Sequence, residues 1–278
     1  MTRAEQNLFF KAGGFLSSCC ILLLLMLAEN TVPLLPESCN AAAGRPPGIL
    51  IHLLGQFFVS DPLVPFISLF TAVLYTLFVS CAILILFGKI QTPVLLFFGL
   101  FALTFMFEIL RILVPLKELY NISPVMLVVG TRILIFSRLF GTFSLLISGV
   151  YAAGFDMQKQ GKLIIGAIIA LLVISLRLPV NGYSWDTSYT PVFAYSLMFR
   201  HTEAVLALIT GISFLIAAFN KGISGYRFIA LGAILVFSGR SLLFGADAWL
   251  ALLPALILLT AGTWLLITKL QKILLNAE

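Results

Sequence analysis

The most regular feature of the chain is a series of long apolar runs, each separated from the next by a short polar or proline-containing segment. Crossing a hydrocarbon core of about 30 Å takes roughly 20 apolar residues in an α-helix. By this measure the pattern predicts eight helical spans, at 8–28, 63–87, 94–114, 124–153, 162–180, 201–219, 226–245 and 248–269. Because only a tight turn around Asp247 separates the last two, seven spans is the alternative.

The composition agrees with this pattern. Of the 278 residues, 61% are hydrophobic and 10% are charged, and the mean hydropathy is +1.11. Soluble domains contain about 45–50% apolar and about 25% charged residues, and a soluble fold has too little interior to hide so much apolar surface. The alternating strands of a transmembrane barrel are missing from the sequence. We therefore predict an all-α fold, a polytopic transmembrane helical bundle in which residues 1–278 form one integral membrane domain.

The Lys and Arg residues near the span ends predict the orientation of the bundle. With an even number of spans, nine of them lie on the side of both termini and four on the opposite side, where Arg177 and Arg200 stand at the border. Cytoplasmic loops carry the excess of Lys and Arg, so both termini should be cytoplasmic. The net charge of +6 then needs no nucleic-acid partner, because the chain has no Lys/Arg cluster of the kind that binds phosphates. The pattern is typical of a small multi-pass protein of the bacterial cell inner membrane.

Two external segments are long enough to have structure of their own. Residues 29–62 form an external loop whose proline-free part, 48–60, predicts a short interfacial helix with a narrow polar stripe. This helix either packs over the bundle or gates a ligand site. Residues 181–200 form an external loop rich in Tyr, Trp and Phe, which is either an aromatic belt at the headgroups or a lid over an external cavity.

Six ionisable side chains fall inside the predicted spans, where a charge at the bilayer centre costs about 2.5–3.5 kcal/mol even on the most lenient scale. They are Glu108, Arg111, Arg132, Arg138, Glu203 and Arg240. The topology places them in the outer half of the membrane or near its middle. Four arginines against two glutamates leave two positive charges in excess, and arginine stays protonated. Water, backbone carbonyls, external acids, a lipid phosphate or an anionic ligand must compensate for this excess.

Two interpretations of these residues stay open. In the first, the arginines extend to the headgroups and brace the bundle. In the second, they form an anion-binding site. Its polar centre would be Arg138, Arg132, Arg240 and Glu108, with Arg111, His201 and Glu203 at the rim.

The leading functional hypothesis is a non-enzymatic bundle that binds an anionic ligand or a lipid headgroup from the outer side, as a sensor, accessory or transport subunit. Its expected partners are membrane lipid, an anionic small molecule and a partner membrane protein. A small-anion or lipid transporter is one alternative, and its polar path would continue into the inner half. A membrane enzyme is the other, for which Cys39 and His201 would have to converge. No spacing typical of a metal site or a cofactor-binding motif is present, so we expect neither a metal nor a cofactor.

Small residues recur every seven positions in the seventh predicted span. Gly225, Gly232, Gly239 and Ala246 form one seam along a helix, and such a seam lets a neighbouring helix approach closely. The seam therefore predicts tight helix packing along this face.

The orientation can be tested with reporter fusions. A reporter fused after Tyr189 should be external, and reporters fused after Gln160 or Glu278 should be cytoplasmic, because the charge bias sets both termini inside. Accessibility of each reporter in intact cells measures this. A C-terminal reporter found outside would contradict the predicted topology and invert every membrane depth assigned above.

Overall fold

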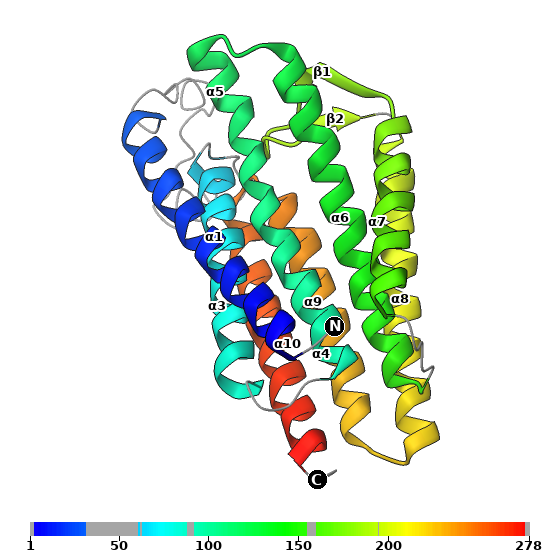
Figure 1. Cartoon of the computed structure of the whole chain (residues 1–278). Coiled ribbons are helices and arrows are strands. Elements are labelled where there is room, and N and C mark those ends of the chain that lie inside the picture. Colours follow the sequence, from blue (N-terminus) through cyan, green and yellow to red (C-terminus); the bar gives the residue numbers. More distant parts are fainter. Residues whose placement is uncertain are drawn as a thin grey trace, which may run out of the picture.

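The structure, a computed structural model, is a bundle of long helices that run side by side in alternating directions (Figure 1). It describes residues 3–31, 61, 63–87, 92–154, 160–193 and 195–275. Seven helical stretches of the described residues are long and apolar enough to cross a membrane, one of them formed by Pro93–Lys117, and a further helix, α7, has 18 residues. The predicted fold class, a helical bundle of a multi-pass membrane protein, is confirmed.

The helices correspond closely to the predicted spans. In chain order they are α1 (Arg3–Thr31), α3 (Leu63–Phe87), α4 (Pro93–Leu103), the 3₁₀ helix η3 (Thr104–Ile112), α5 (Leu113–Tyr120), α6 (Pro124–Ala152), α7 (Gln160–Arg177), α8 (Ser196–Lys221), α9 (Gly225–Phe244) and α10 (Trp249–Leu275). The last two are separate helices. The predicted loop 29–62 with its helix at 48–60 lies outside the described residues, apart from the end of α1 and Asp61.

Local sequence explains where several helices begin. Thr92 and Ser123 each precede a proline, and their side chains accept hydrogen bonds from the backbone N–H of Leu95 and Val125. A hydroxyl at the N-cap followed by proline at the first helical position satisfies donors that an α-helix leaves free at its start. The two caps fix the beginnings of α4 and α6, two helices with many buried residues.

The third predicted span, 94–114, is wrong in one respect, because it is not one continuous α-helix. Its middle, η3, is a 3₁₀ helix of nine residues between α4 and α5. Runs of 3₁₀ helix longer than three or four residues are uncommon, and they often mark a strained or functional segment. This one contains Glu108 and Arg111, both almost completely buried.

The segment predicted as a loop at 181–200 contains a short antiparallel hairpin, β1 (Val180–Trp185) with β2 (Pro191–Phe193), and the first residues of α8. Thr187 ties the hairpin to the bundle, since its hydroxyl donates a 2.8 Å hydrogen bond to Asp247 Oδ2. The hairpin lies at the same end of the bundle as α5 (Figure 1). We call this the hairpin end.

The predicted seam of small residues is confirmed for Gly225, Gly232 and Gly239, which pack against α10, whereas Ala246 lies after the end of α9. A Cβ atom placed on Gly239 would lie 2.8 Å from the backbone N of Leu259 and 3.0 Å from the carbonyl O of Ala255. One placed on Gly232 would lie 3.0 Å from the carbonyl O of Gly262. Backbone meets backbone along this face, so α9 and α10 can stay this close only without side chains there.

Gly239→Ala should therefore lower the free energy of unfolding by about 1–3 kcal/mol, because the added methyl group forces two backbones apart. Gly166→Ala is the matched control, since a Cβ on this residue of α7 would meet nothing within 4 Å. We expect that variant to be neutral or stabilised by about 0.5–1 kcal/mol. Thermal unfolding in detergent compares the two, and equal midpoints would contradict the close packing of α9 on α10.

Candidate functional site

The site is built around a carboxylate in the interior of the bundle. Glu108 is 0% exposed, and it lies on η3 between Phe105 and Arg111, at intervals of three residues. A 3₁₀ helix has three residues per turn, so side chains three apart lie directly above one another. All three side chains therefore point into the bundle, which the 100° spacing of an α-helix would not achieve.

Two arginines neutralise Glu108. Arg138 on α6 donates two hydrogen bonds of 2.8 Å, from Nε to Oε1 and from Nη2 to Oε2. Arg111 places its Nη1 3.6 Å from Oε2, and its Nη2 donates to the carbonyl O of Ser188 in the turn of the hairpin. The paired geometry on Arg138 is the strong form of an arginine–carboxylate interaction. The ion pair thus links η3, α6 and the hairpin.

Arg240 on α9 is held differently, because no carboxylate lies within ion-pair distance of it among the described residues. Its side chain is buried, and Nη2 donates a 2.8 Å hydrogen bond to the carbonyl O of Arg138. Its Nε and Nη1 are buried with no hydrogen-bond partner. A buried guanidinium with two unpartnered nitrogens is costly unless another group compensates.

Aromatic rings supply part of that compensation. The guanidinium carbon of Arg240 lies 5.0 Å from the ring centre of Phe244, 5.4 Å from that of Phe101 and 5.8 Å from that of Phe105. The negative face of an aromatic ring attracts a cation at these distances. Gly141 leaves room for the guanidinium tip, since a Cβ there would lie 3.3 Å from Nη1.

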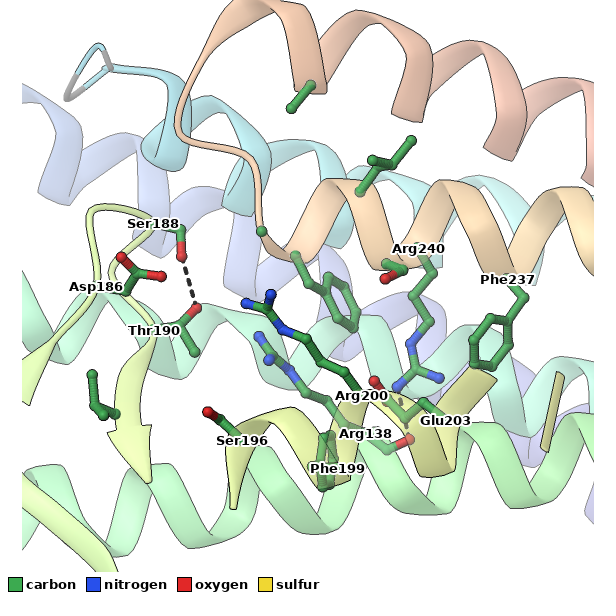
Figure 2. Close-up of a pocket in the computed structure, with 16 residues that line it drawn as sticks. Arg138, Asp186, Ser188, Thr190, Ser196, Phe199, Arg200, Glu203, Phe237 and Arg240 are labelled. Atoms are coloured by element: carbon green, nitrogen blue, oxygen red, sulfur yellow. Dashed lines mark hydrogen bonds between the residues drawn. The ribbon is translucent and has the colours of Figure 1, made fainter. Parts of the chain in front are cut away.

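A cavity of about 360 Å³ opens beside these arginines toward the hairpin end. Its wall comes from α6, the hairpin, α8, α9 and the start of α10. Figure 2 shows Arg138 and Arg240 at this cavity with Arg200 and Glu203 of α8. Glu203 forms no ion pair within the described part of the chain, but its charge interacts with those of Arg240 and Arg138.

The charges at the cavity do not balance. We count the charged residues that line the cavity together with Glu108 and Arg111, which lie behind Arg138. The four arginines are Arg111, Arg138, Arg200 and Arg240, and the three carboxylates are Glu108, Asp186 and Glu203. One positive charge is in excess. The excess guanidinium donors can donate hydrogen bonds to an anion.

The structure brings together some of the residues predicted for the site and separates others. Arg138, Arg240 and Glu203 line the cavity, and Glu108 and Arg111 support it from behind. Arg132 is half-buried on α6 and does not line it, and His201 is exposed on α8. Six residues separate Arg132 from Arg138, about 120° around an α-helix, so the two arginines face different neighbours.

Sequence reasoning missed Arg200, which it assigned to the border of a span. It missed Gly141 and the three phenylalanines as well. The available signal was the i, i+4 spacing of Phe101 and Phe105 ahead of Glu108, which is also typical of an ordinary core.

The described residues form neither a metal site nor the hypothetical thiol site. Within the described residues, no three His, Cys, Asp or Glu side chains gather closely enough to hold a metal ion. Cys39, the cysteine of the hypothetical thiol site, lies outside those residues. Comparison with models of protein families, with curated proteins and with solved structures finds no match for this chain.

The ion pair yields a direct prediction. Arg138→Leu should destabilise the protein by about 3–5 kcal/mol, because it leaves the buried Glu108 with only the 3.6 Å contact to Arg111. Adding Glu108→Gln should recover part of this loss, since the double variant has no unpaired carboxylate. Thermal unfolding of both single variants and the double variant in detergent measures the coupling, and strictly additive losses would contradict a shared ion pair.

Proposed function

We propose that this chain is a multi-pass protein of the bacterial inner membrane that binds an anionic ligand, a free anion or a lipid headgroup, in the cavity at the hairpin end. It would act as a sensor, an accessory or a transport subunit. Arg240 is the principal ligand-binding residue in this proposal, with Arg200 at the mouth and Arg138 in the wall. Glu108 and Arg111 hold Arg138 in place.

The observation that carries the proposal is the state of Arg240. Its Nε and Nη1 are buried without partners at the edge of a cavity, in a cluster with one excess positive charge. Arg138, by contrast, uses Nε and Nη2 on Glu108 and needs no ligand to justify its burial. The two interpretations of the sequence thus apply to different arginines. Arg138 is a structural group, and Arg240 is the group that an anion would complete.

Binding is better supported than transport. A transporter needs a polar path through the whole bundle. A cavity of about 390 Å³ lies at the end opposite the hairpin, where Tyr151, Lys221 and Tyr226 are among its lining residues, but the bundle is closely packed between this cavity and the site. The pocket next to Phe98, Leu145 and Phe214 measures about 10 Å³, near the minimum volume that can hold one water molecule. The enzyme hypothesis gains no support from the described residues, because His201 is exposed and does not line the cavity.

Inorganic phosphate is a suitable first probe, because its oxygens match the donors of a guanidinium. Binding should raise the thermal midpoint of the purified full chain in neutral detergent. Arg240→Lys should weaken phosphate binding by about 10-fold to 100-fold, since lysine keeps the charge and loses the planar set of donors. Isothermal titration measures the affinity, and the thermal midpoint without phosphate reports whether the variant folds.

Arg227→Leu is the matched control. Arg227 is exposed near the opposite end of α9, where its guanidinium lies over the ring of Phe219. Its removal should leave phosphate binding unchanged. Equal weakening by Arg227→Leu and Arg240→Lys would show that phosphate responds to net charge alone, and the proposed site would then be wrong.

A further inference from the structure

From the shape and lining of the same cavity we infer that its natural ligand is an anionic amphiphile, a molecule with one acidic headgroup and an alkyl chain, which enters sideways from the membrane between α8 and α9. This inference rests on the proposed anion site. It adds the class of ligand and the route by which the ligand arrives.

The size of the cavity argues against a small inorganic anion as the complete ligand. A volume of about 360 Å³ is many times the roughly 10–15 Å³ that one water molecule requires. An anion of four oxygens bound at Arg240 would leave most of that volume empty. Pockets of this size typically hold a molecule with many more atoms.

The lining of the cavity combines charged and hydroxyl groups with apolar side chains. Phe237 lies one helical turn before Arg240 on α9, and Phe199 of α8 also lines the cavity. At the mouth, Val192 of the hairpin is 44% exposed and Leu242 of α9 is 39% exposed. A headgroup held by arginine and a chain lying along these four side chains would satisfy both parts of the wall.

The outer half of α8 provides the route. None of its residues from 196 to 209 is buried, and the buried residues of α8 begin at Thr210. Phe199 and Glu203, four residues apart, border the cavity on one face. Leu197, Val205 and Leu208 are at least half exposed. In a bilayer this part of α8 is a single layer of helix between lipid and cavity.

The contact between α8 and α9 is close only farther from the hairpin end. A Cβ on Gly211 of α8 would lie 3.0 Å from the side chain of Ile234 of α9. Above this contact the two helices border the cavity with Arg200 and Glu203 on one side and Ser241 and Leu242 on the other. Ser241 and Leu242 are both exposed, so the chain of a bound amphiphile can pass between the helices into the lipid.

Three probes test the inference on the full chain in neutral detergent: inorganic phosphate, hexyl phosphate and hexyl glucoside. Hexyl phosphate should bind at least tenfold more tightly than phosphate, a difference of about 1.4 kcal/mol, because its chain buries apolar surface in the cavity. Hexyl glucoside has the chain without the anion and should not bind. Isothermal titration gives all three affinities.

Leu242→Ala should weaken hexyl phosphate binding several-fold and leave phosphate binding unchanged, since it removes a chain contact and no donor. Leu231→Ala is the matched control, because Leu231 is an exposed leucine of the same helix that does not line the cavity. Equal affinities for phosphate and hexyl phosphate, tight binding of hexyl glucoside, or equal losses in both leucine variants would overturn the amphiphile and leave the anion site standing. Failure of both phosphate and hexyl phosphate to bind would overturn the anion site as well.

Discussion

A carboxylate that is completely buried among apolar helices must be matched by donors, and Glu108 sets this requirement for the whole bundle. An unpaired charge in the hydrocarbon region costs several kcal/mol. The requirement is met by Arg138 from α6 and Arg111 from the same helix, at the position where η3 departs from α-helical geometry. Because Arg111 also donates to Ser188, the position of the hairpin follows from the same carboxylate.

The environment of Arg240 follows from the pairing of Glu108 with Arg138 and Arg111. Glu108 is already shared by two arginines, so the nearest buried acid is not available to a third. The guanidinium is held instead by a carbonyl oxygen and three aromatic rings, which stabilise its charge without satisfying its donors. Arg138 and Arg240 thus lie side by side and differ in whether a carboxylate occupies their donors.

Much of the fold was predictable because it depends on local composition. Apolar runs of about 20 residues locate the helices, and the seven-residue recurrence of glycine locates the packing of α9 on α10. The sequence also identified Glu108, Arg138, Glu203 and Arg240 as the side chains that need an explanation. These features follow from the free-energy cost of exposing backbone polar groups and charges to hydrocarbon. This cost depends on each residue by itself, so it can be read from the sequence.

Other features depend on contacts between distant segments. No local pattern in Thr104–Ile112 predicts a 3₁₀ helix, which has poorer hydrogen-bond geometry than an α-helix and here carries Glu108 to Arg138 of another helix. The hairpin at 180–193 likewise depends on Asp247 and Arg111. Arg132 and Arg138 are close in sequence, yet only one of them reaches the cavity, because the rotation of α6 within the bundle decides which side chain points inward.

The 3₁₀ segment also changes how far the chain reaches. Nine residues of η3 advance about 18 Å along the helix axis, where an α-helix of equal length would advance about 13.5 Å. Together with α4, the twenty residues Pro93–Ile112 extend about 34 Å and cover a hydrocarbon core of about 30 Å by themselves. α5 therefore adds length beyond what the core requires, and its Lys117 ammonium lies 4.6 Å from the ring centre of Trp185 in the hairpin.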